Sequence, residues 1–258
     1  MFVDERHEKI LDILDEKGRI KAREIQELFD VGFDTARRDL RILEEKGQLK
    51  RIHGGAIPIV QVGFTTPKTY TPRDVTDIKK NYWSITKEAL SLIKEHDVVY
   101  ITGASIGFFM SQNLPTDIEF TVATNSIIIA DELRKYDNVT TYVLGGLMTK
   151  KGQLRDHHTV HVIKSMRFDL AFLTAAAFSA EFGMSIQSAN SVMVTQAIIE
   201  SSRKCIGLFP HEKMGRESIL KVCPATDLNL IITDWDTCKT EIEKIENQDI
   251  KLIIAKEL

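Results

Sequence analysis

The spacing of apolar residues divides the chain into two parts with different periodicities. In the first part, apolar side chains recur every three or four positions, which is typical of short amphipathic helices. We predict helices over about 4–15, 21–29 and 34–46 from this pattern. Gly47 follows the third helix, where a glycine commonly adopts a left-handed backbone that ends the helix.

A short hairpin is predicted directly after these three helices. Residues 49–56 alternate apolar and basic side chains and then turn at a pair of glycines, which is the pattern of a small wing. Residues 58–75 hold several prolines and a threonine-rich stretch, and they predict an extended linker. Residues 1–57 therefore read as one small domain with a helix-turn-helix at about 20–39.

From residue 76 onward, short apolar runs alternate with helical segments. A long helix is predicted over about 76–94. The predicted strands are 98–101, 120–124, 141–144, 170–174, 205–209, 228–233 and 250–254. Strands that are apolar on both faces indicate a mainly parallel sheet with helices on two sides. Residues 76–258 are therefore predicted to be an α/β domain.

Composition narrows the class of protein without naming a function. The chain has 258 residues, of which 43% are hydrophobic, and a net charge of −3. The first 57 residues carry nearly equal numbers of basic and acidic side chains, so nucleic-acid contact must come from a local patch. Cys205, Cys223 and Cys238 are widely spaced, and no apolar run suits a signal peptide or a membrane span. We expect a cytoplasmic protein with free thiols and no membrane contact.

The third predicted helix carries a cationic surface. Arginine suits both bidentate contact with guanine and pairing with phosphate, so double-stranded DNA is the predicted partner. The predicted contacts on this helix are Thr35, Arg37, Arg38 and Arg41, and those on either side are Lys21, Arg23, Lys50, Arg51, His53, Gly54 and Gly55. A solvated helix of an unrelated domain is the alternative. The helix lengths, the turn and the basic hairpin favour DNA binding.

Two motifs in this region carry a resemblance to a known family. Residues 35–40 read Thr-Ala-Arg-Arg-Asp-Leu and residues 53–56 read His-Gly-Gly-Ala. Residues 3–57 thus resemble the winged helix-turn-helix of DeoR-type regulators, which implies a transcriptional regulator, a repressor of a carbohydrate-catabolism operon, that works as a homodimer or homotetramer. One departure is Gly32, where the family has a serine, and it removes a side-chain helix cap.

Three turns follow predicted strands in the larger domain. Ligands of open parallel sheets bind beyond the carboxyl ends of the strands, and helix N-termini there favour phosphate. Each turn alone could simply connect a strand to a helix, but together they predict an anion site. The residues are Thr102, Gly103, Ala104, Ser105, Thr124, Asn125, Ser126, Gly145 and Gly146.

The resemblance continues over residues 76–235. DeoR-type effector domains are similar in fold to ribose-5-phosphate isomerase and glucosamine-6-phosphate deaminase, and they sense phosphorylated sugars. This resemblance adds Lys213 to the predicted effector site. Ile101 and Pro210 stand where the family carries acidic residues. A sugar's hydroxyls need acceptors, so an unusual ligand, weak binding or loss of small-molecule sensing all stay open.

Catalysis, metal binding and cofactors are not expected. The alternative is a sugar-phosphate isomerase or deaminase fused to a DNA-binding domain. The residues at Ile101 and Pro210 argue against it, because proton transfer needs a positioned base. His157 and His161 could share a helix face as metal ligands do, yet the start of a surface helix explains them better.

Overall fold

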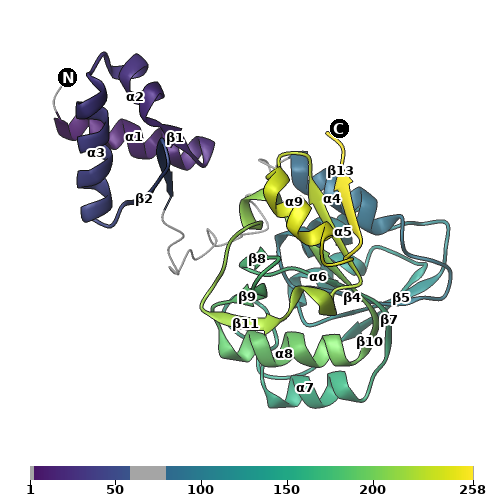
Figure 1. Ribbon diagram of the computed structural model, residues 1–258. Coiled ribbons are helices and arrows are strands. Elements are labelled where there is room, and N and C mark those ends of the chain that lie inside the picture. Colours follow the sequence, from purple (N-terminus) through teal and green to yellow (C-terminus); the bar gives the residue numbers. More distant parts are fainter. Residues whose placement is uncertain (1–2, 59–79, 258) are drawn as a thin grey trace. The chain divides into compact units, whose positions relative to one another are not determined.

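The computed structural model describes residues 3–58 and 80–257, drawn as solid ribbons in Figure 1. The chain divides into two units, Met1–Gln61 and Val62–Leu258. Nearly all of the predicted linker, residues 58–75, lies outside the described residues. Each unit is therefore treated by itself.

Residues 3–58 of the N-terminal unit form three helices and a small antiparallel sheet (Figure 1). Its helices are α1 (Val3–Lys17), α2 (Ala22–Phe29) and α3 (Phe33–Glu45). Its strands are β1 (Ile20–Lys21), β2 (Leu49–Ile52) and β3 (Gly55–Pro58), in the order β1-β3-β2. The predicted helices and hairpin are confirmed with ends shifted by one or two residues. Strand β1 was not predicted, because two residues show no periodicity.

The wing is held against the helices by a close approach of backbones. Gly55 in β3 pairs with Lys21 in β1, and a Cβ atom added at Gly55 would lie 2.1 Å from the carbonyl oxygen of Ile20. Only glycine fits there without moving a strand. Gly47 has a φ of 69°, which confirms the predicted left-handed turn after α3.

A buried ion pair joins α1 to α3. The carboxylate of Asp39 accepts hydrogen bonds from Arg6, from Nε at 2.7 Å and from Nη2 at 3.2 Å, and the Nε2 atom of His7 lies 3.1 Å from it. The Arg6 and Asp39 side chains are 8% and 3% exposed. The hydrogen bond to Asp39 raises the pKa of Arg6. This contact fixes the rotation of α3, so the neighbouring Arg37 and Arg38 face outward.

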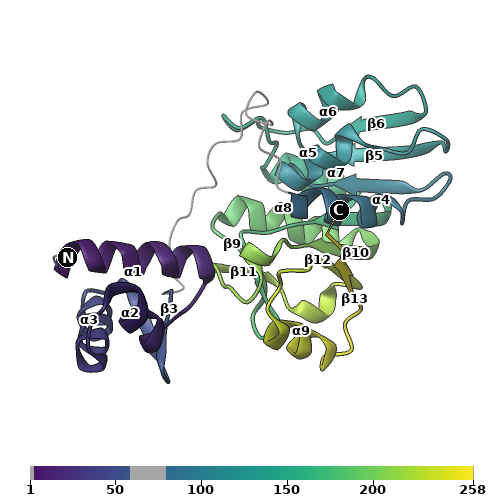
Figure 2. The same cartoon turned by 90° about the horizontal axis from the view of Figure 1, so that it is seen from above.

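The second unit is built on a seven-stranded parallel sheet. The strand order is β13-β12-β10-β7-β4-β5-β6. The strands are β4 (Val98–Ile101), β5 (Phe120–Thr124), β6 (Val139–Val143), β7 (Phe168–Leu173), β10 (Ser202–Leu208), β12 (Leu230–Asp234) and β13 (Leu252–Ala255). Figure 2 shows β5 and β6 at one end of this sheet. Every predicted strand is present, and the predicted parallel α/β class is confirmed.

Helices cover both faces of this sheet (Figure 1). They are α4 (Lys80–Leu90), α5 (Ser105–Gln112), α6 (Ile127–Leu133), α7 (His157–Lys164), α8 (Ala189–Glu200) and α9 (Lys239–Glu246). Successive strand residues point to opposite faces. Val99 and Ile101 pack with α4 and α5, whereas Tyr100 packs with residues of α7 and α8. This alternation gives one hydrophobic core on each side of the sheet.

Two features differ from the sequence prediction. A second, antiparallel sheet of β11 (Leu220–Cys223), β9 (Gly183–Ile186) and β8 (Ala177–Ser179) was missed, because its strands are short and contain small residues. The helix predicted to reach Lys94 ends at Leu90, because the next residues close in tighter turns.

Replacing Asp39 with alanine should destabilise the N-terminal unit by about 3–5 kcal/mol, because the buried Arg6 guanidinium would lose its counter-ion. Hydrogen exchange of α1 and α3 amides in the intact chain measures this loss. The matched control is the Arg6→Met/Asp39→Leu double variant, which should recover most of the protection. A loss below about 1 kcal/mol would mean that the pair behaves like a surface ion pair.

Candidate functional sites

Helix α3 presents the predicted cationic surface to solvent. Arg37, Arg38 and Arg41 are exposed, and Thr35 is half-buried. The guanidinium of Arg37 lies 5.8 Å from the centre of the Phe33 ring, which is itself 44% exposed. The exposed arginines are therefore available for contact with a nucleic acid.

The predicted DNA contacts on either side of α3 fall into an exposed group and a group that packs against the rest of the N-terminal unit. Lys21, Arg23, Lys50, His53 and Gly54 are exposed, as contact with DNA requires.

Arg51 and Gly55 instead attach the wing to α3 and β1. The backbone N–H of Arg51 donates to Glu44 at 2.9 Å, and its guanidinium lies 3.7 Å from the same carboxylate. Gly55 is buried against β1. These two residues support the wing, and a direct contact with DNA from Gly55 would need it to leave this packing.

The start of α3 agrees with the departure noted at Gly32. Gly32 is the N-terminal cap and makes no side-chain cap hydrogen bond. Asp34 lies in the first turn of the helix, where a negative charge interacts favourably with the helix dipole.

In the second unit, the carboxyl ends of all seven parallel strands lie along one edge of the sheet. The loop after β4 holds Gly103, and a Cβ atom added there would lie 3.0 Å from the Cβ of Ser126 after β5. The structure thus brings two of the three predicted turns together. Gly146 in the third turn approaches Asp156 and Thr159 at the start of α7 instead.

The Thr124–Ser126 side chains are less available than the sequence suggested. All three are buried. The hydroxyl of Thr124 donates to the Ile101 carbonyl at 3.0 Å, Asn125 accepts from the Tyr100 hydroxyl at 3.0 Å, and Ser126 caps α6. These side chains hold the loops in place, so a ligand would meet them mainly through the surrounding backbone.

Lys213 lies at the same edge. It ends a short 3₁₀ turn, η2 (His211–Lys213), which follows β10. Its Nζ donates to the hydroxyl of Thr174, after β7, at 3.1 Å. Burial lowers the pKa of Lys213 to about 8. The amine therefore reaches the end of β7, whose neighbour in the sheet is β4, the strand before the loop that begins at Thr102.

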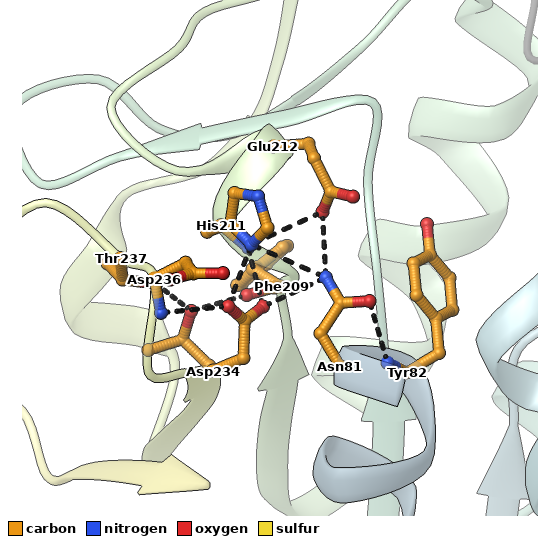
Figure 3. A network of polar contacts seen from close by, with 9 residues as sticks. Asn81, Tyr82, Phe209, His211, Glu212, Asp234, Asp236 and Thr237 are labelled. Atoms are coloured by element: carbon orange, nitrogen blue, oxygen red, sulfur yellow. Dashed lines mark hydrogen bonds and ion pairs between the residues drawn. The ribbon is translucent and has the colours of Figure 1, made fainter. Parts of the chain in front are cut away.

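A polar network beside Lys213 was not predicted (Figure 3). The Nδ1 atom of His211 lies 2.7 Å from Asp234 Oδ1, and the Nδ2 atom of Asn81 donates to Glu212 Oε2 at 3.1 Å and to Asp234 Oδ2 at 3.2 Å. The hydrogen bond to Asp234 raises the pKa of His211. Burial works to raise the pKa of Asp234, but its hydrogen bonds with His211 hold that pKa below the usual value.

Only part of this network could be found from the sequence. His211 and Glu212 directly precede the predicted Lys213, but nothing marked Asn81, which is 131 residues from Glu212. His157 begins α7, and Asp156 caps that helix by accepting from the Thr159 N–H at 2.9 Å. The interpretation of the histidines as a helix start is therefore confirmed.

Within residues 3–58 and 80–257, no helix combines the length and apolarity that crossing a bilayer requires.

A winged helix-turn-helix with an exposed arginine surface, together with a parallel α/β domain, defines a DNA-binding transcriptional regulator with a sensor domain. Comparison with known proteins agrees. A model of the DeoR-like helix-turn-helix domain matches residues 6–62, and a model of the DeoR C terminal sensor domain matches residues 79–235. The chain belongs to the DeoR family of transcriptional regulators.

Similar proteins match along nearly their whole length. The transcriptional regulator GolR of Listeria innocua is 28% identical over 99% of this chain and 100% of its own. The repressor GlcR of Bacillus subtilis is 29% identical over 100% and 98%. The glycerol-3-phosphate regulon repressor of Haemophilus influenzae is 26% identical over 97% and 96%.

Solved structures with a related fold include ribose 5-phosphate isomerase A from Neisseria gonorrhoeae. It is 12% identical and covers 54% of this chain and 55% of its own, with a TM-score of 0.40. A likeness of this size carries over no property of the enzyme.

Replacing Arg37 or Arg38 with alanine should weaken binding to a DNA fragment selected by the purified chain by about 1–3 kcal/mol, if that arginine reads a base. Fluorescence anisotropy at fixed salt measures the affinity. Arg134→Ala, a change of an exposed arginine in the other unit, is the control and should have no effect. An equal loss on scrambled DNA would assign the arginine to phosphate contact, and no loss for either variant would contradict the α3 surface.

Proposed function

We propose that this regulator is a repressor that binds its operator as a homodimer or homotetramer and releases it on binding a phosphorylated sugar or a related small anion. The single observation that carries the proposal is Lys213, a half-buried lysine at the carboxyl edge of the parallel sheet whose amine donates to Thr174 after β7, in a chain whose α3 presents arginines for DNA.

An anionic ligand suits the electrostatics of this edge. Burying a cation costs free energy, which is why the pKa of Lys213 falls to about 8. A phosphate placed near the amine would offset that cost. Loop backbones around Gly103 and Ser126 could contribute further N–H donors.

The name of one relative mentions the same class of compound. It is called the glycerol-3-phosphate regulon repressor. This name describes that protein, and it makes a phosphorylated metabolite the first class to test here.

Release of DNA requires two states with different ligand affinities. Paired reading helices match half-sites about 34 Å apart, so a small change in subunit geometry breaks the match. A ligand that binds the mismatched state more tightly shifts the population toward it. DNA must then weaken ligand binding by the same factor.

A thermal-shift screen of the intact chain should find a phosphorylated sugar that raises the melting temperature, because a ligand of the native state stabilises it. Matched unphosphorylated sugars are the control and should give no shift. A flat response to every phosphorylated sugar would favour a regulator that has lost small-molecule sensing. Turnover of ribose 5-phosphate or glucosamine 6-phosphate in the same samples would instead establish an enzyme.

Replacing Lys213 with methionine should abolish the response to the sugar phosphate found in that screen and leave DNA binding without ligand unchanged. Methionine keeps most of the buried volume but removes the charge. DNA release measured by anisotropy reports both properties, and exposed Lys239→Met serves as the control. Undiminished release in Lys213→Met would remove this lysine from the effector site.

A further inference from the structure

Three potential metal ligands converge beside the carboxyl ends of β10 and β12. They are His211 Nδ1, Glu212 Oε2 and Asp234 Oδ1. In the described part of the chain, these three residues form a group whose potential ligand atoms all lie within 4.8 Å of one another. The side chain of Asp234 is fully buried, and those of His211 and Glu212 are 33% and 30% exposed. This cluster therefore differs from acidic groups that are spread over a solvated surface.

The separations suit a single small cation. His211 Nδ1 lies 2.7 Å from Asp234 Oδ1 and 3.8 Å from Glu212 Oε2. Bonds of zinc to imidazole nitrogen and carboxylate oxygen are about 2.0–2.2 Å long, so two ligands at a tetrahedral angle lie about 3.4 Å apart. The observed distances fall on both sides of that value, and small side-chain rotations would equalise them.

Surrounding donors already orient the carboxylates. The second oxygen of Asp234, Oδ2, accepts from the backbone N–H of His211 at 2.8 Å and from Asn81 at 3.2 Å (Figure 3). The same amide of Asn81 donates to Glu212 at 3.1 Å. Metal sites in proteins typically have such outer hydrogen bonds to their ligating carboxylates.

We propose that His211, Glu212 and Asp234 bind one divalent transition-metal cation, with Zn²⁺ or Mn²⁺ the best match to one imidazole and two carboxylates. Two carboxylates and a neutral imidazole balance the charge of the cation. In this state the metal replaces the proton that His211 shares with Asp234. This site departs from the expectation that the chain binds no metal, and it does not depend on the proposed repressor function.

A bound cation would be a second ligand, in addition to the proposed anion, at the edge of the sheet that holds Lys213. Three protein ligands leave a coordination position for water or for an oxygen of another molecule. Asn81 lies at the start of α4, so a bound cation would also tie this helix to the η2 turn. Metal occupancy could then modify the response of the regulator to an anion.

The test is titration of the intact, chelator-treated chain with Zn²⁺, Mn²⁺ and Mg²⁺ by calorimetry. We expect one Zn²⁺ or Mn²⁺ per chain and weaker binding of Mg²⁺, which prefers oxygen ligands. Glu212→Gln should weaken binding at least about tenfold, and Asn81→Ala by about 10–100-fold, the usual effect of removing an outer hydrogen bond. Circular dichroism confirms that each variant is folded.

A matched control separates this site from other histidines. His157 and His161 lie four residues apart on the exposed side of α7, so the His157→Ala/His161→Ala variant should bind metal as the unchanged chain does. Loss of binding in that variant would overturn the proposal. Absence of binding by any of the metals, or unchanged binding in both Glu212→Gln and His211→Ala, would also overturn it.

The visible spectrum of bound Co²⁺ reports on the metal ligands themselves, which a measurement of folding does not. Co²⁺ bound by one nitrogen and two carboxylate oxygens should give visible absorption bands, and these should change or vanish in His211→Ala. If that variant does not fold, the Co²⁺ spectrum of Glu212→Gln decides. A spectrum identical to that of the unchanged chain would exclude Glu212 as a ligand and reject the site.

Discussion

The predicted DNA-reading surface of α3 depends on one buried contact, the ion pair of Asp39 with Arg6. Asp39 belongs to the same motif as Arg37 and Arg38, but its side chain points the other way and is almost fully buried. A charge in the interior must keep its partner, so α3 can hardly rotate without a large cost. One short motif therefore supplies both the exposed cations and the internal group that aims them.

The sensor unit also separates residues that pack in the core from polar residues at the ends of the strands. Strand residues alternate between two cores, while chemically reactive groups gather where the strands end. That geometry explains why Lys213, Asp234 and Ser126 share an edge although they are far apart in sequence. It also explains why polar side chains can be misread. Thr124 and Asn125 stand at the carboxyl edge of the sheet, yet their hydrogen bonds go to the protein itself.

Periodicity predicted most elements, because helices and buried strands repeat over several residues. It could not predict β1, which spans two residues, or β8, whose Ala-Phe-Ser sequence shows no alternation of apolar and polar residues. The candidate site was predictable only where a motif marked it, as at Lys213. Asn81 could not be predicted, because its place in the network depends on a contact with a residue 131 positions away, which no local sequence pattern records.

The η2 turn connects Lys213 with the polar network around Asn81. Lys213 contacts Thr174 at the end of β7, while its neighbours His211 and Glu212 contact Asn81 in α4. Three consecutive residues therefore connect the end of β7 with α4. If Lys213 holds the ligand of the proposed function, that ligand lies on the same turn as the partners of Asn81, and α4 is the first described helix after the segment that joins the two units. The route from ligand to DNA affinity can begin with this contact.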